Sequence, residues 1–178
     1  RIVRERHPAP VGGAAETRPA GHDDRRQLVE TERPCRGVLD ADTDVFFASV
    51  LGGSSASDPR VRYDRLSGRW FVTMITVNTP NRVLVAVSSA AVLTSTASFT
   101  FFQFQHDLAG PTPNADTGGF ADYDTLGVDA HALYVGVNVF NAAGTALLGT
   151  TGYVINKADL LAGTLTVTAF RQLASGGG

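Results

Sequence analysis

The run Trp70-Phe71-Val72-Thr73-Met74-Ile75-Thr76-Val77 decides the fold class of this chain. Its residues are mostly aromatic, β-branched or aliphatic, a composition that favours a β-strand. The turn that precedes it contains Gly68, which suits a left-handed backbone position, and Asn78-Thr79-Pro80-Asn81 closes it. The sequence therefore predicts a strand over 70–77 between two turns.

Three further strands surround this one. They are predicted over 61–63, before the turn at 64–69, and over 82–88 and 98–105, after it. In the last of them polar and aromatic residues partly alternate, which is typical of a strand with two different faces. Together the four segments predict a four-stranded antiparallel unit.

The same pattern then returns. A second set of strands is predicted over 125–129, 132–140, 152–156 and 164–171, with one short helical candidate, 157–161. The copies align at nearly constant offsets: Tyr63-Asp64 with Val128-Asp129 at 65 residues, Trp70 with Leu133 at 63, and Phe99, Phe101 and Phe104 with Leu165, Val167 and Phe170 at 66. Each unit is about 45 residues long, the length of one propeller blade.

These observations predict an all-β fold: two four-stranded antiparallel blades of the propeller type, forming a fragment of a larger β-propeller, with a β-sandwich as the alternative. The expected organisation is a tail over 1–44, a first blade over 45–105, a long connecting loop over 106–124 and a second blade over 125–173. The residues expected in the core are Trp70, Ile75, Val85, Phe101, Val135 and Val167.

Residues 1–44 differ from the remainder in composition. They are rich in Arg, Pro, Gly and Ala and contain no Phe, Tyr or Trp. Such a segment cannot bury enough apolar surface to offset the entropy of ordering it, so we expect a disordered linker or pro-region, or a non-native tail.

Charge and composition exclude several classes of protein. Fifteen Lys and Arg residues against 17 Asp and Glu residues give a net charge of −2, which disfavours nucleic-acid binding. The single Cys35 excludes an internal disulfide framework. No apolar run is long enough to predict a membrane span, and no signal peptide is visible in this segment.

Two turns carry a resemblance to a known group of proteins. The run Asp58-Pro59-Arg60-Val61-Arg62-Tyr63-Asp64 with Ser67-Gly68-Arg69-Trp70-Phe71, and the later run Asp122–Asp129 with Ala132–Val135, resemble blades of secreted bacterial β-propellers that are sialidase-like in architecture. The turns are similar to the Asp-box without matching its order, because Asp64 precedes Ser67, Gly68 and Trp70. The resemblance implies a protein that is secreted or in the cell envelope.

The function we expect is non-catalytic: a portion of an extracytoplasmic propeller that binds a small ligand, a glycan or a protein. The nucleophile-elbow, phosphate-loop and HExxH motifs are absent from the sequence. The alternative is a fragment of a propeller-type glycoside hydrolase whose catalytic residues lie partly outside this chain. Tyr63 and Tyr123 are present for such chemistry, but no glutamate follows Glu32.

Meander geometry predicts where the functional residues gather. Asp58, Asn81, His106, Asp107 and Asn141 are expected on one ligand-binding face, and the 64–69 turn and His131 on the opposite one. The acidic loop supplies Asp116, Asp122 and Asp124 as a candidate calcium site, with turn capping as the alternative role. Because two blades leave sheet edges open, self-association through those edges is also expected.

Overall fold

The computed structural model describes residues 41–173, which form two four-stranded antiparallel sheets. This confirms the all-β class. In each sheet the strands are hydrogen-bonded in chain order. Sheet A contains β1 (Ala56–Asp64), β2 (Arg69–Thr76), β3 (Arg82–Ser88) and β4 (Phe99–Gln105), and sheet B contains β5 (Phe120–Val128), β6 (Ala132–Phe140), β7 (Leu147–Asn156) and β8 (Val167–Phe170).

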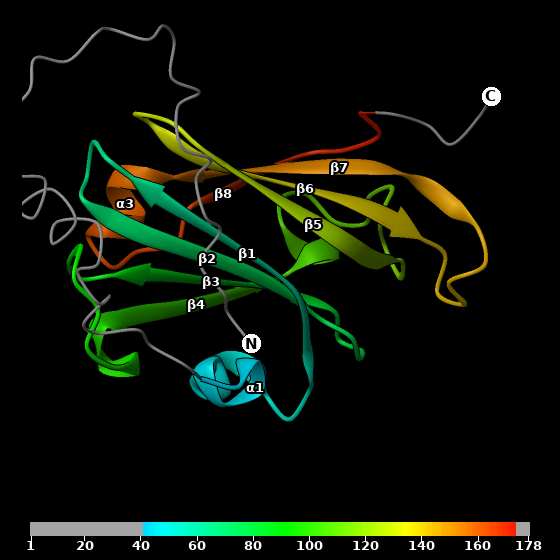
Figure 1. Cartoon of the computed structure of the whole chain (residues 1–178). Helices are drawn as coiled ribbons and strands as arrows, with labels where there is room; N and C mark the ends of the chain where they lie inside the picture. Colours follow the sequence, from blue (N-terminus) through cyan, green and yellow to red (C-terminus); the bar gives the residue numbers. More distant parts are fainter. Residues whose placement is uncertain (1–40, 174–178) are drawn as a thin grey trace, which may run out of the picture.

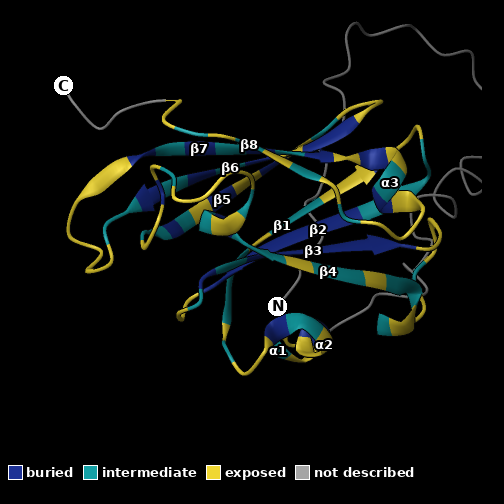
Figure 2. Cartoon of the chain, turned by 180° about the vertical axis from the view of Figure 1, so that it is seen from behind, coloured by how far each residue is buried: buried dark blue, intermediate teal, exposed yellow. Residues whose placement is uncertain are grey.

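The elements form three layers, with sheet A between sheet B and a pair of short helices (Figure 1). The helices are α1 (Thr43–Phe46) and α2 (Ala48–Leu51), and a third, α3 (Lys157–Leu161), leads from β7 towards β8. Two single 3₁₀ turns, η1 (Thr96–Ser98) and η2 (His106–Leu108), flank β4. Strands β2 and β3 are the most completely buried part of the molecule (Figure 2).

Two apolar layers result from this stacking. The layer between the sheets joins side chains such as Phe71, Val85, Leu133 and Tyr153, all of them buried. The second layer lies on the other face of sheet A and joins Val72, Met74, Leu84 and Ala86 to the helices. Successive residues of a strand point to opposite faces, so β2 and β3 supply both layers at once.

The helix pair was not predicted and shortens the expected tail. Asp42 caps α1 by accepting hydrogen bonds from the backbone N–H of Asp44 (2.9 Å) and of Val45 (3.4 Å). Phe46 and Phe47 are buried against the Phe99–Phe101 part of β4 in edge-on contacts with ring centroids 5.0 to 5.6 Å apart. The expected boundary at residue 44 is therefore wrong, because residues 41–44 belong to this layer; residues 1–40 of the expected tail lie outside the described residues.

The internal repeat extends to details of the backbone. Both β1 and β5 contain an irregularity in their pairing, between Ser57 and Arg60 and between Asp122 and Thr125. At its centre Asp58 (φ 55°) and Tyr123 (φ 54°) adopt left-handed backbone conformations, which residues other than glycine rarely do. These two residues are 65 positions apart, the offset predicted for the first strand of each unit.

Strand boundaries and one offset differ from the prediction. Strands β1, β5 and β7 begin earlier than expected, so the connection between the sheets covers only 106–119. Phe101 pairs with Ala86, whereas Ala169 pairs with Tyr153 at the equivalent position, so the fourth strands align at 68 residues and not at 66. The longer β6–β7 hairpin of the second unit accounts for this shift.

The expected core is correct in part. Ile75, Val85 and Val135 are buried between the sheets, as predicted. Trp70, Phe101 and Val167 are only partly buried. Trp70 opens β2 at the rim and donates a hydrogen bond from Nε1 to the Ala91 carbonyl (2.8 Å), while Phe101 and Val167 lie on the edge strands β4 and β8.

Candidate functional site

Most of the polar residues predicted to bind a ligand make hydrogen bonds within the fold. Asn81 is buried where the β2–β3 turn meets sheet B. Its amide nitrogen donates to the Thr76 carbonyl (2.5 Å), and its amide oxygen accepts from the backbone N–H of Ala121 (2.7 Å). The amide nitrogen therefore closes the β2–β3 turn, and the amide oxygen joins this turn to β5 of sheet B.

His106 and Asp116 lie in a buried polar cluster at the same end of the stack. The carboxylate of Asp116 is paired with Arg171 and accepts a hydrogen bond from Thr151 Oγ1 (2.7 Å). His106 Nε2 lies 2.9 Å from the Gly119 carbonyl, and burial lowers the pKa of this imidazole. Arg171 and Tyr153 both donate to the His106 carbonyl, so the cluster clamps the 106–119 connection onto sheet B.

Asp107 and Asn141 stabilise loops. Asp107 accepts hydrogen bonds from Gln105 Nε2 (2.8 Å) and from the backbone N–H of Gly118 (3.1 Å). Asn141 bonds to Thr145 and to the backbone N–H of Ala146 within the β6–β7 turn. These contacts are typical of turn-forming residues. Of the five residues expected on the ligand-binding face, only Asp58 is not seen making a contact of this kind among the described residues.

The three carboxylates expected to bind calcium have separate surroundings. Asp116 lies in the buried polar cluster with Arg171 and Thr151. Asp122 accepts a hydrogen bond from the backbone N–H of Tyr123 (2.9 Å). Asp124 accepts one from Thr73 Oγ1 (2.6 Å) in the layer between the sheets. Over residues 41–173 no group of three or more His, Cys, Asp or Glu residues is placed to hold a metal ion. Calcium binding stays a prediction, and these residues do not form a shared ligand set.

Asp124 is the most unusual carboxyl group in the described part of the chain. It is completely buried, and its Oδ1 has no hydrogen-bond partner. Burial raises its pKa to about 6, although the Thr73 hydroxyl and the nearby Arg60 oppose the shift. Arg60 reaches across from β1, donates from Nε to the Asp124 carbonyl (2.7 Å) and lies over the Tyr123 ring, 5.0 Å from its centroid.

At the other end of the stack an ion pair joins the sheets. Lys157 Nζ lies 2.8 Å from Asp64 Oδ2, with both side chains buried, and also donates to the Asp129 carbonyl. Burial opposes ionisation of Asp64, but the hydrogen bonds from Lys157, Ser67 and two backbone N–H groups bring its pKa down to about 2. His131 follows at this end, where its carbonyl accepts from the backbone N–H of Lys157.

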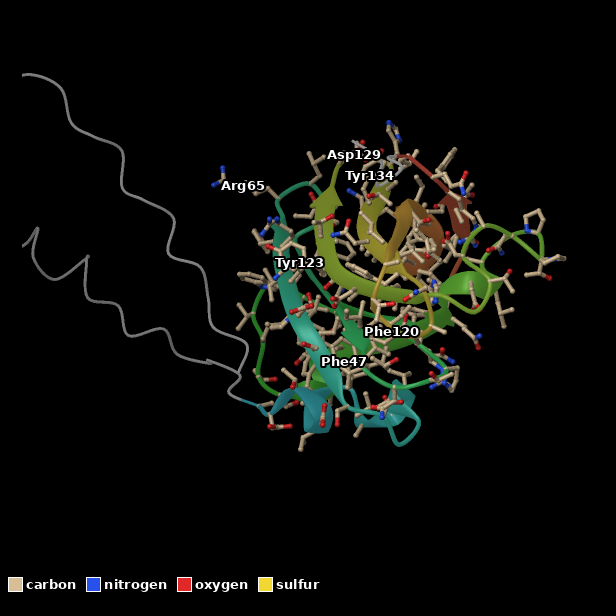
Figure 3. The ribbon with its side chains drawn as sticks, turned by 90° about the vertical axis from the view of Figure 1, so that its right-hand side faces the viewer. Phe47, Arg65, Phe120, Tyr123, Asp129 and Tyr134 are labelled. Atoms are coloured by element: carbon tan, nitrogen blue, oxygen red, sulfur yellow. The ribbon has the colours of Figure 1, made fainter. Side chains whose placement is uncertain are left out.

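The face of sheet B that points away from sheet A is uncovered in the described part of the chain, and we call it the outer face of sheet B. Gly136, Gly152 and Phe170 form one cross-strand row on it, next to Tyr134. Tyr134 and Phe170 are 41% and 50% exposed. Figure 3 shows Tyr134 beside Asp129 on the opposite side of the stack from Phe47. The tyrosine hydroxyl donates to Asp129 Oδ2 (2.8 Å), which fixes the ring at the rim.

A shallow, mainly apolar groove of about 470 Å³ runs across this outer face. Its lining residues include Gly127, Tyr134, Gly136, Gly152, Val154, Phe170 and Leu173. A Cβ atom added at Gly152 would lie 2.9 Å from the end of the Leu173 side chain, so the groove depends on the missing side chain there. This groove is the candidate functional site.

Comparison of equivalent positions in the two sheets distinguishes the outer face of sheet B from the face of sheet A that packs on sheet B. Strand pairing makes Tyr134, Gly136 and Gly152 of sheet B equivalent to Phe71, Thr73 and Val85 of sheet A. In sheet A these three positions are completely buried against sheet B. At the same positions of sheet B the chain has a hydroxylated ring and two glycines, so the outer face is hollower than the contact that sheet A makes with sheet B.

Sequence reasoning missed this groove, although a signal for it is present. In the run Leu133-Tyr134-Val135-Gly136-Val137-Asn138-Val139 every second residue is aliphatic, and these residues form the buried face. The residues between them are small or polar, as expected for a strand that is covered on one side only.

Comparisons with protein families, with curated proteins and with solved structures find no match for this chain. Within residues 41–173 no helix has the length and apolar character needed to cross a membrane.

Proposed function

We propose that this chain is a non-catalytic binding portion of an extracytoplasmic, propeller-type protein, and that its binding surface is the outer face of sheet B. The observation that carries the proposal is the contrast between two equivalent faces: Phe71 and aliphatic side chains fill the face of sheet A, and two glycines leave the face of sheet B hollow. The meander of each sheet and the repeated bulges support a blade-type unit.

The shape of the groove favours an aromatic or apolar side chain of a partner protein as the bound group. Glycines let such a group approach the backbone of the sheet closely. Tyr134 and Phe170 offer ring surfaces at its sides, and the Tyr134 hydroxyl is held by Asp129. An aromatic residue entering a groove of this kind is a common anchor of protein interfaces.

The test uses N-acetyltryptophanamide as a stand-in for the partner's side chain, and a methyl glucoside as a stand-in for a glycan. Each is titrated into the full chain and followed by backbone NMR. We expect shifts at Gly127, Tyr134, Gly136 and Gly152 with the indole probe, and none there with the sugar. If the sugar alone produced these shifts, the partner class would be a glycan.

A pair of valine variants sharpens the test. Gly152→Val fills the groove, and the nearest atom to be displaced is the free end of Leu173. Ala142→Val adds a branched side chain in the exposed β6–β7 turn and is the matched control. We expect Gly152→Val to weaken binding at least tenfold and Ala142→Val to leave it unchanged. Equal binding by both variants, or no indole shifts in the parent chain, would refute the groove as a binding surface.

The alternative function is a fragment of a propeller-type glycoside hydrolase, and one observation favours it. A carboxyl group whose pKa is raised to about 6, beside an arginine and a tyrosine, is typical of an acid catalyst. Asp124 is enclosed between the sheets, however, and is not among the residues that line the groove. Turnover of aryl glycosides that disappears in Asp124→Asn would support this alternative; absence of turnover in the parent chain would leave the binding proposal in place.

A further inference from the structure

The two sheets have four edge strands, β1, β4, β5 and β8. An edge strand presents unpaired backbone N–H and C=O groups, which recruit other strands. Proteins protect such edges with charges, proline, bulges or very short strands. An edge without these features is open to a partner strand as far as residues 41–173 are concerned.

Three edges are protected. Strand β1 contains Pro59 and Arg60 and the bulge at Asp58. Strand β5 contains the bulge at Tyr123 with an aspartate on either side, and it lies alongside β1 (Figure 1). Strand β8 is only four residues long and is followed by Arg171.

Strand β4 has none of these features. Its seven residues, Phe99-Thr100-Phe101-Phe102-Gln103-Phe104-Gln105, include no charge, proline or glycine. Its pairing with β3 runs from Arg82–Gln105 to Ser88–Phe99 without a register shift. Thr100 and Gln103 are exposed, and the four phenylalanines are only partly buried. A regular, uncharged edge of this length is prepared to receive another strand.

We propose that β4 pairs with β4 of a second copy of this chain, antiparallel about a two-fold axis at Phe102. The two A sheets then continue into one eight-stranded sheet, twice the four strands of each. This register sets Phe101 against Gln103 of the second copy, Thr100 against its Phe104 and Phe99 against its Gln105. No like charges meet, whereas self-pairing of β1 or β5 would bring arginines or aspartates together.

A two-fold pairing of identical strands also explains why the partner is the chain itself. The same seven residues supply both sides, and the contact closes on itself without leaving a further β4 edge. It uses a surface separate from the groove on sheet B, since β4 belongs to sheet A. The dimer therefore leaves the proposed binding surface free.

Sedimentation velocity of the full chain tests the proposal. We expect a concentration-dependent dimer in the parent chain, and at least a tenfold weaker dimer in Gln103→Lys, because each new ammonium group would lie against Phe101 of the other copy. Thr168→Lys places the same charge at an exposed site on the other outer edge strand, β8, and should leave dimerisation unchanged. Gln103→Thr, which adds no charge, should also still dimerise.

Amide hydrogen exchange provides a second readout. Backbone amides of residues 99–105 should exchange faster in Gln103→Lys than in the parent chain, while those of β8 stay the same. A parent chain that is monomeric up to concentrations on the order of 1 mM, a dimer that survives Gln103→Lys, or open-ended fibres would each overturn the proposal. A dimer lost in Gly152→Val but kept in Gln103→Lys would assign self-association to the groove instead.

Discussion

Sheet A and sheet B are built from the same repeated pattern, yet they occupy different environments. Sheet A is covered by helices on one face and by sheet B on the other, and β2 and β3 are buried almost throughout. Within residues 41–173 sheet B is covered on one face only, and alternate residues of β6 and β7 are at least partly exposed. The repeated pattern therefore specifies the backbone of both sheets, whereas the side chains determine which face stays exposed.

The largest effect is expected where sheet A meets the helices. Phe47 is completely buried there against Phe46 and Phe101. Phe47→Ala should lower the free energy of unfolding by about 3 to 5 kcal/mol, because it leaves a cavity that the layer cannot close. Val45→Ala, two residues earlier in α1 and 67% exposed, is the control and should change little. Urea unfolding measures both, and equal effects would show that the helices do not cover sheet A.

Breaking the ion pair between the sheets should destabilise the fold nearly as much. Lys157→Met removes the partner of the buried Asp64 carboxylate, and we expect a loss of about 3 kcal/mol, since an unpaired buried charge is costly. Adding Asp64→Asn to this variant should recover part of that loss. The free energy lost through Asp64→Asn is measured both in the parent chain and in Lys157→Met. If the two losses are equal, Lys157 and Asp64 are not coupled and the ion pair does not join the sheets.

Asp124, which is buried between the two sheets, should make the stability of the fold depend on pH. Its folded pKa of about 6 lies above its ordinary value of 3.8, so folding retains a proton that the unfolded chain releases. The free energy of unfolding should therefore fall by about 2 kcal/mol as the pH rises from 4 to 6, and by about 3 kcal/mol in all between pH 3 and pH 7.

The measurement is the difference between the parent chain and Asp124→Asn at each pH. His106 contributes with the opposite sign, because burial lowers its pKa and stability rises as the unfolded imidazole loses its proton. Asp64, with its lowered pKa, adds stability as the pH rises above about 2. Both effects are shared by the two chains and cancel, so parallel curves would contradict the raised pKa of Asp124.

The smallest effect is expected on the outer face of sheet B. Tyr134 is 41% exposed, and its hydroxyl bonds only to the exposed Asp129. Tyr134→Ala should change the free energy of unfolding by less than about 1 kcal/mol while weakening binding of the indole probe. A loss as large as that of Phe47→Ala would mean that the outer face is part of the folding core, and the contrast between the sheets would disappear.

Local patterns predicted the strands well because each strand is bounded by its own turn chemistry. The Asp64 turn is an example: the carboxylate accepts from the backbone N–H groups of Leu66 and Ser67, as Asp129 does from His131 and Ala132. Helices α1 and α2 were missed because four-residue helices leave almost no periodic signal. Their two phenylalanines were visible, but the face that they cover belongs to strands far along the chain.

The candidate site was harder to predict than the fold. Polar residues in loops suggested ligand binding, yet Asn81, His106 and Asp116 satisfy backbone groups and one another inside the stack. Their partners lie between 5 and 65 residues away along the chain, and such pairing cannot be derived from local sequence. The groove depends on glycines whose role appears only once β6 and β7 are paired.

The chain-order pairing of the strands also bears on how the molecule folds. Each sheet grows by adding the next strand along the chain, so its loop closures are short and cost little entropy. The Lys157–Asp64 contact, in contrast, closes a loop of 93 residues. Hairpins within each sheet are therefore expected to form early, with docking of the two sheets as the late, slower event, and substitutions at Lys157 would then alter the unfolding rate more than the folding rate.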